Sequence, residues 1–270
     1  MKEEIKMRKR SRILLLAMLI AAVAAIAMMP ATAMAATSHT IHVDIVEGND
    51  TNDGLIQATA VQTLTKAFQM VTTAESYTIK VYGGETPYPS PGIISIASGA
   101  SVIVEAGDTA PVTVYKNPEL ATNKLFEFNN QTFSYITFDG ITLTGDNPAT
   151  PEVEKAGYGV YINSCDRAEG NAAYFYNSIF ENLDFGIWQD YSDYLYVTVE
   201  DCQITAKRPI NMGYGKKLTV LNSELALSED AESSYSVINL DGNSNIEVKD
   251  SELIGNNGIG RGIYEDINSG

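Results

Sequence analysis

Three aspartates that close similar short segments are the residues best placed for catalysis. Asp190, Asp241 and Asp266 end the segments 187–190, 238–241 and 263–266. Paired carboxylates can hydrolyse a glycosidic bond, provided that burial or a neighbouring charge raises the pKa of one of them. Stacked strands lie about 4.8 Å apart, so Asp190 and Asp241, two strands apart, would be separated by roughly 9–10 Å. This distance is near the upper limit for the two carboxylates of an inverting glycoside hydrolase. Asp241 and Asp266 would be about 5 Å apart, which is close to the separation of the two carboxylates in a retaining glycoside hydrolase.

The same segments, together with 160–163 and 210–213, carry aromatic and amide side chains at matching places. Such a mixture suits sugars, whose C–H faces stack on aromatic rings while their hydroxyls form hydrogen bonds. We therefore predict a carbohydrate-binding strip. The alternative is that these are ordinary surface residues, or aligned aspartates that are common in an acidic chain. The predicted binding residues are Tyr161, Asn163, Trp188, Asn211, Asn239 and Tyr264.

A sequence repeat positions these residues. It consists of two sets of segments that alternate along the chain and recur with a similar period. Column A comprises 136–143, 173–180, 197–204, 218–225 and 246–253; its first, third and eighth places are apolar, and its fifth is Gly, Asn or Asp. Column B comprises the five segments that carry the strip. The steps are 37, 24, 21 and 28 residues in column A and 27, 23, 28 and 25 in column B. Short alternating strands repeating in this way are typical of a β-solenoid, and the Asx or Gly place is a turn that tolerates left-handed backbone.

The first 35 residues form a predicted signal peptide and not part of the fold. Six basic residues precede the apolar run 13–29, and Ala33-Met-Ala35 is a small-x-small cleavage site. We therefore expect a secreted or cell-surface protein. An uncleaved membrane anchor is the alternative.

The charge of the remaining chain is strongly negative. Of the 18 basic and 34 acidic residues, the leader holds six and two, which leaves 12 against 32 and a net charge of −20. This charge argues against nucleic acid as a partner, and against polyanions unless cations intervene.

Residues 36–76 are expected to form an N-terminal cap. Apolar and polar residues alternate over 40–46, which predicts a strand, and the Gly-, Asn- and Asp-rich segment 48–54 predicts a turn. An amphipathic helix from Thr63 to Ala74 is predicted by the helical spacing of Leu64, Ala67, Phe68 and Val71. This opening, followed by 79–84 and 102–106, resembles the right-handed parallel β-helix proteins of the pectin-lyase-like group. The resemblance covers 40–270 and implies an all-β, right-handed parallel β-helix of about seven coils over 77–270, with an N-terminal capping helix.

The resemblance leaves the activity open, because the group includes lyases, glycoside hydrolases, epimerases and non-catalytic surface proteins. No run matches the group's lyase or polygalacturonase motifs. The basic pairs 207–208 and 216–217 are candidate lyase bases or, alternatively, solvated turn charges. No cofactor is identified. Calcium is considered only at Asp50, Asn52 and Asp53, where a plain turn is the other interpretation.

Two cysteines, Cys165 and Cys202, could pair in an exported protein. They lie in different columns, and Cys202 aligns with Ser178, Ser223 and Ser251, which favours small residues filling a core corner.

The leading functional hypothesis is a secreted or surface module that interacts with extracellular polysaccharide or cell-surface glycan. A polysaccharide lyase or glycoside hydrolase acting on the same strip is one alternative, and a structural stalk or adhesin is another. We expect no membrane partner beyond the signal peptide. Because the sequence stops just after a coil strand, we also expect further domains of a longer chain.

Overall fold

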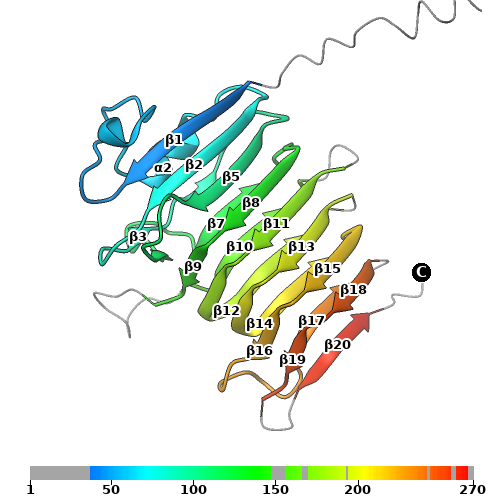
Figure 1. Cartoon of the computed structure of the whole chain (residues 1–270). Coiled ribbons are helices and arrows are strands. Elements are labelled where there is room, and N and C mark those ends of the chain that lie inside the picture. The colour runs from blue at the N-terminus through cyan, green and yellow to red at the C-terminus, as the bar shows by residue number, and fades with distance from the viewer. Residues whose placement is uncertain are drawn as a thin grey trace, which may run out of the picture. The chain divides into compact units, whose positions relative to one another are not determined.

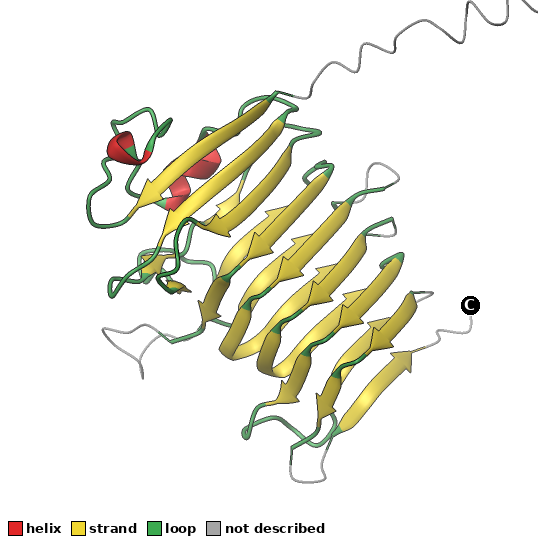
Figure 2. Ribbon diagram, viewed as in Figure 1, coloured by secondary structure: helices red, strands yellow, loops and turns green. Residues whose placement is uncertain are grey.

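The computed structural model describes residues 37–146, 156–165, 170–192, 194–241, 244–256 and 260–266. The predicted signal peptide, residues 1–35, lies outside this part of the chain. The described residues form an all-β structure of long parallel sheets (Figure 2), with one short α-helix and one 3-10 turn, an architecture consistent with a parallel β-helix.

Column A is one side of this structure, an eight-stranded parallel sheet whose strands follow one another in chain order (Figure 1). The predicted register of the repeat is confirmed: Ile136 pairs with Ala173, Ala173 with Val197, and Val197 with Leu218. The strands are β1 (Ser38–Asp44), β2 (Ser76–Tyr82), β5 (Ser101–Ala106), β8 (Tyr135–Asp139), β11 (Ala172–Tyr176), β13 (Tyr196–Glu200), β15 (Lys217–Leu221) and β18 (Asn245–Lys249).

Column B belongs to a second, twelve-stranded parallel sheet, and its predicted register is also confirmed. Two of its strands, β12 and β14, are long enough to continue into a neighbouring column. The strands are β4 (Gly92–Ile94), β7 (Lys124–Asn129), β10 (Tyr158–Asn163), β12 (Ile179–Asp190), β14 (Gln203–Gly213), β17 (Ser236–Asp241) and β20 (Arg261–Asp266).

A third set of strands, column C, is not apparent from the repeat pattern in the sequence. The eighth apolar place of the column A segments lies beyond the turn, so Leu143, Phe180, Ile204 and Leu225 pair with one another in column C. Besides the first halves of β12 and β14, this column holds β3 (Tyr88–Pro89), β6 (Val112–Tyr115), β9 (Ile141–Thr144), β16 (Glu224–Leu227) and β19 (Glu252–Ile254).

The alternating residues of the three columns meet in one core. Phe126, Phe138 and Phe175 are fully buried; Phe138 stacks on Phe175 with ring centroids 5.6 Å apart and meets Phe126 edge-on at 4.8 Å. Burying rings of this size contributes about 2–3 kcal/mol each relative to exposure, which makes the core the main stabilising element.

The turn residues after column A behave as predicted. Gly140, Asn177, Asp201, Asn222 and Asp250 all have left-handed backbone, with φ between 46° and 70°. Gly adopts this conformation without a Cβ clash, and Asn and Asp adopt it more readily than other residues. The chain can therefore leave column A sharply and enter column C within two residues.

Small polar residues stack at the corner between columns A and C. The hydroxyl of Ser223 accepts a hydrogen bond from the Cys202 N–H at 3.1 Å and donates to the Leu221 carbonyl at 2.7 Å; Ser178 repeats this pattern two coils earlier. Cys202 takes the same place, its thiol 3.3 Å from the Glu200 carbonyl, and burial raises the pKa of this thiol to about 11. Cys165 is buried at a different corner, after column B. The two buried cysteines therefore lie at different corners, in agreement with the small-residue interpretation.

The N-terminal helix is shorter than expected, and the predicted capping helix over 63–74 is not supported. Only α2 (Leu64–Gln69) is α-helical; Thr63 caps it by accepting a hydrogen bond from the Lys66 N–H. The β-branched residues Val71, Thr72 and Thr73 follow it, and these are poor helix formers. A 3-10 turn, η1 (Gln57–Thr59), precedes it. Strand β1, which the sequence places in the N-terminal cap, is instead the first strand of column A.

Candidate functional site

The candidate strip is formed by two rows of side chains along column B. In the outer row Tyr161 pairs with Trp188, Trp188 with Asn211, Asn211 with Asn239, and Asn239 with Tyr264. In the second row Asn163 pairs with Asp190, Gly213 with Asp241, and Asp241 with Asp266. Strand pairing thus brings together the residues that the sequence singled out, from segments as far apart as 160–163 and 263–266.

An aromatic cluster lies at the start of this strip and is larger than predicted. Tyr158 stacks on Phe185 with centroids 4.6 Å apart, and both rings meet Trp188 edge-on, at 5.5 and 4.4 Å. Tyr161 completes the cluster by meeting Tyr158 edge-on at 5.5 Å. All four side chains are only partly buried. Phe185 is not among the predicted binding residues, although its pairing with Tyr158 follows from the column B register.

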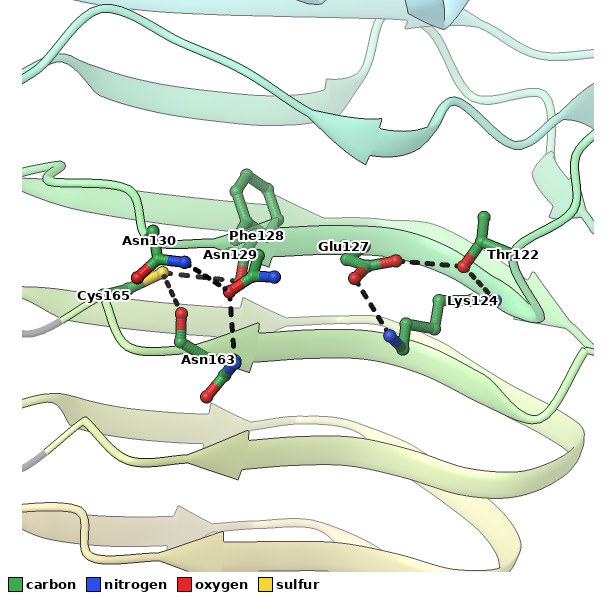
Figure 3. Close-up of polar contacts among 8 residues, drawn as sticks. All are labelled: Thr122, Lys124, Glu127, Phe128, Asn129, Asn130, Asn163 and Cys165. Atoms are coloured by element: carbon green, nitrogen blue, oxygen red, sulfur yellow. Dashed lines mark hydrogen bonds and ion pairs between the residues drawn. The ribbon is translucent and has the colours of Figure 1, made fainter.

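Two cations border the aromatic cluster. The Lys124 ammonium lies 4.0 Å from the centroid of Tyr161 and forms an ion pair with Glu127 at 2.9 Å (Figure 3). Arg208 lies 4.2 Å from the ring centroid of Tyr235 and 5.8 Å from that of Phe185. Such cation–π contacts hold the two basic groups against the rings.

The neighbouring lysine behaves differently from Arg208. Lys207 forms ion pairs with Asp184 at 2.9 Å and Asp230 at 3.3 Å, which agrees with the interpretation as a turn charge. The Arg208 side chain instead packs against the rings of Phe185 and Tyr235. Its Nε and the Trp188 Nε1 are shielded from solvent and have no hydrogen-bond partner among the described residues. Unpaired buried donors are uncommon, and each costs about 1–3 kcal/mol, which packing of the cluster must offset.

Amides and carboxylates form the second row. Asn163 donates a hydrogen bond to Asn129 at 3.1 Å, which continues the row toward the N-terminus (Figure 3). The Asp190 carboxylate lies over Gly213, since a Cβ at Gly213 would meet its Oδ1 at 2.9 Å. Burial, and then the charge of Asp241 beyond Gly213, raise the pKa of Asp190, so the two carboxylates interact across the glycine. This is the electrostatic pattern that a general acid needs.

Three of the predicted residues are placed less favourably for binding. Asn211 is only 2% exposed, and its amide oxygen accepts a hydrogen bond from Asn239 at 2.8 Å within the row. The Arg261 guanidinium lies 4.6 Å from the ring centroid of Tyr264, which is half-buried. Asp266 pairs with Asp241 through its backbone, and its side chain lies outside the described residues.

The loop that we considered for calcium uses its carboxylates in turns. Asp50 accepts hydrogen bonds from the Thr63 hydroxyl and from the backbone N–H groups of Gln62 and Thr63, at 2.8 to 2.9 Å. Asp53 accepts hydrogen bonds from Leu55 and Thr59. Within the part of the chain that the structure describes, no three His, Cys, Asp or Glu residues are grouped to hold a metal ion.

No protein-family model matches the sequence, and no curated protein is significantly similar to it. Among the described residues, no helix has the length and apolar character required to cross a membrane.

Proposed function

We propose that the chain is a secreted, right-handed parallel β-helix of the pectin-lyase-like type whose candidate strip binds extracellular carbohydrate. Residues 1–35 would act as the signal peptide. The observation that carries the proposal is the cluster of Tyr158, Tyr161, Phe185 and Trp188 beside the Asn163 and Asp190 row.

The chemistry of this cluster matches that of a sugar-binding face. Partly exposed rings supply flat apolar surface, and the adjoining amide and carboxylate supply hydrogen-bond donors and acceptors within one strand spacing. Because side chains on paired strands keep a fixed distance, the face is pre-organised and loses little side-chain freedom on binding. A stalk would need no such combination of rings and polar groups.

The test is retention on a panel of neutral and acidic polysaccharides, with and without calcium. We expect Trp188→Ala to weaken retention at least tenfold. The matched control is Tyr174→Ala, because Tyr174 also belongs to an outward ring cluster, formed with Tyr135 and Tyr176, but on column A. Equal losses in both variants, or no retention of any polymer by the parent chain, would count against the strip and favour the stalk.

Glycoside hydrolysis is the second candidate function. It is favoured by the raised pKa of Asp190 and by the charge of Asp241 across Gly213, which resemble the separation of roles between an acid and a base. The assay is release of new reducing ends from each polymer. Loss of turnover with unchanged retention in both Asp190→Asn and Asp241→Asn would support hydrolysis, whereas retention without any release would leave binding alone.

A further inference from the structure

All four exposed tyrosines of the described residues lie at one corner, where the chain passes from column B to column A. Tyr191, Tyr194, Tyr196 and Tyr214 are 40 to 63% exposed, whereas every other described tyrosine is partly or fully buried. Tyrosine is enriched where proteins contact ligands, because a rigid ring offers a large contact area and a polar tip. The clustering therefore indicates a contact surface.

Two of these tyrosines occupy backbone positions that disfavour them. Tyr191 and Tyr214 have φ of 47° and 66°, in the left-handed region that is unusual for a bulky residue. The same place in earlier coils is taken by Asn130 and Ser164, so smaller side chains satisfy the turn. The rings of Tyr191 and Tyr214 stack on each other, 5.8 Å apart and 13° from parallel, and together present a flat exposed face. Local backbone strain that the turn itself does not require points to function.

A pocket of about 160 Å³ opens within the same corner. It is lined by Gly170, Tyr194, Tyr196 and Lys216, which come from three successive coils. Gly170 has φ of 94°, in the left-handed region that favours glycine, and a Cβ built there would meet no atom within 4 Å, so open space adjoins its Cα. Cavities of this size hold one six-membered ring.

The backbone around the pocket is firmly held. The Tyr196 N–H donates to the Asn171 carbonyl at 3.0 Å, and the Lys216 N–H donates to the carbonyl of the buried Leu195 at 2.9 Å. Asn171 is 2% exposed and its amide donates to the Cys165 carbonyl at 2.6 Å. Paired strands and buried anchors thus set the separation of the lining side chains, as a pre-formed binding site requires.

We propose that this corner is a second binding site that takes a neutral oligosaccharide, with one pyranose ring in the pocket and the next on the Tyr191–Tyr214 face. The tyrosine rings supply stacking surface, and Lys216, which forms no ion pair with any described residue, supplies donors for sugar oxygens. The strongly negative chain disfavours an anionic ring at long range. The site lies outside the candidate strip and does not depend on the function proposed for it.

The test measures the binding of single sugars and their disaccharides by ligand-detected NMR and calorimetry. The probes are glucose, galactose, mannose and N-acetylglucosamine, with galacturonate as the anionic comparison. A ring of this size in a small pocket should bind with Kd on the order of 1 mM. We expect Tyr194→Phe and Lys216→Gln, which preserve packing, to weaken binding at least threefold, and Tyr196→Ala at least tenfold.

Two further variants separate this site from the strip and from misfolding. Tyr191→Asn, which suits the left-handed turn, should remove the gain in affinity of a disaccharide over its single sugar. Tyr174→Ala, on column A and outside both sites, should leave single-sugar affinity within about twofold, which shows that the other losses do not come from misfolding. The proposal is overturned if no neutral sugar binds at about 50 mM, fifty times the expected Kd, if galacturonate binds more tightly than all four, or if only Trp188→Ala reduces binding.

Discussion

The substitution Ser223→Ala tests how the stacked corner between columns A and C holds the coils together. It removes a hydroxyl that accepts from the Cys202 N–H at 3.1 Å and donates to the Leu221 carbonyl at 2.7 Å. The Leu221 carbonyl keeps a second partner, the Asp201 N–H at 3.2 Å, whereas the buried Cys202 N–H is left unpaired. An unsatisfied buried donor costs about 1–3 kcal/mol and the lost second hydrogen bond about 0.5–1.5 kcal/mol, so we expect destabilisation by about 2–3 kcal/mol.

The assay is urea unfolding followed by circular dichroism, together with hydrogen exchange of the peptide that contains Cys202. Exchange of this peptide should accelerate more than that of peptides in distant coils, because the lost contact is local. Ser223→Cys is the matched control: Cys202 shows that a thiol fits this place, so the loss should fall below about 1 kcal/mol. A Ser223→Ala variant within about 0.5 kcal/mol of the parent would refute the reasoning, because the donor must then find another acceptor.

Three further predictions concern the charge, turn and core of the repeat. Burial and the charge of Asp241 raise the pKa of Asp190, so the folded protein is most stable with Asp190 protonated and loses stability as the pH rises through the folded-state pKa. Asp190→Asn should therefore stabilise the protein at pH 7 and lose this advantage below about pH 4. Thermal unfolding measured across this pH range checks the prediction. Asn222→Val forces a β-branched residue into left-handed backbone at φ 46° and should cost about 1–2 kcal/mol, whereas Asn222→Gly should be nearly neutral in urea unfolding. Phe138→Ala removes a fully buried ring from the core and should cost about 3–5 kcal/mol in the same assay; a cost below 1 kcal/mol would contradict the packing described.

The sequence alone determined the periodic part of this protein. Alternation of apolar and polar residues decides which side chains point inward, and a one-residue slip would reverse them all, so the column A and column B registers follow directly from the pattern. The turn residues follow for an equally local reason, because Gly, Asn and Asp tolerate positive φ. Even the pairing of Tyr161 with Trp188 and of Asn163 with Asp190 could be predicted in this way.

The tertiary structure decided what the pattern leaves open. Column C is divided from column A by a turn too short to stand out in the sequence, and the helix after Thr63 ends earlier than its apolar spacing suggests. Burial of Asn211 and the position of Arg208 over Tyr235 depend on neighbouring coils and on the conformation of long side chains. The corner tyrosines were likewise unrecognised as a group, since their turns differ in sequence and meet only because each coil stacks on the next. Local periodicity determines which face a residue occupies, but exposure and charge environment depend on packing between coils, which no single segment encodes.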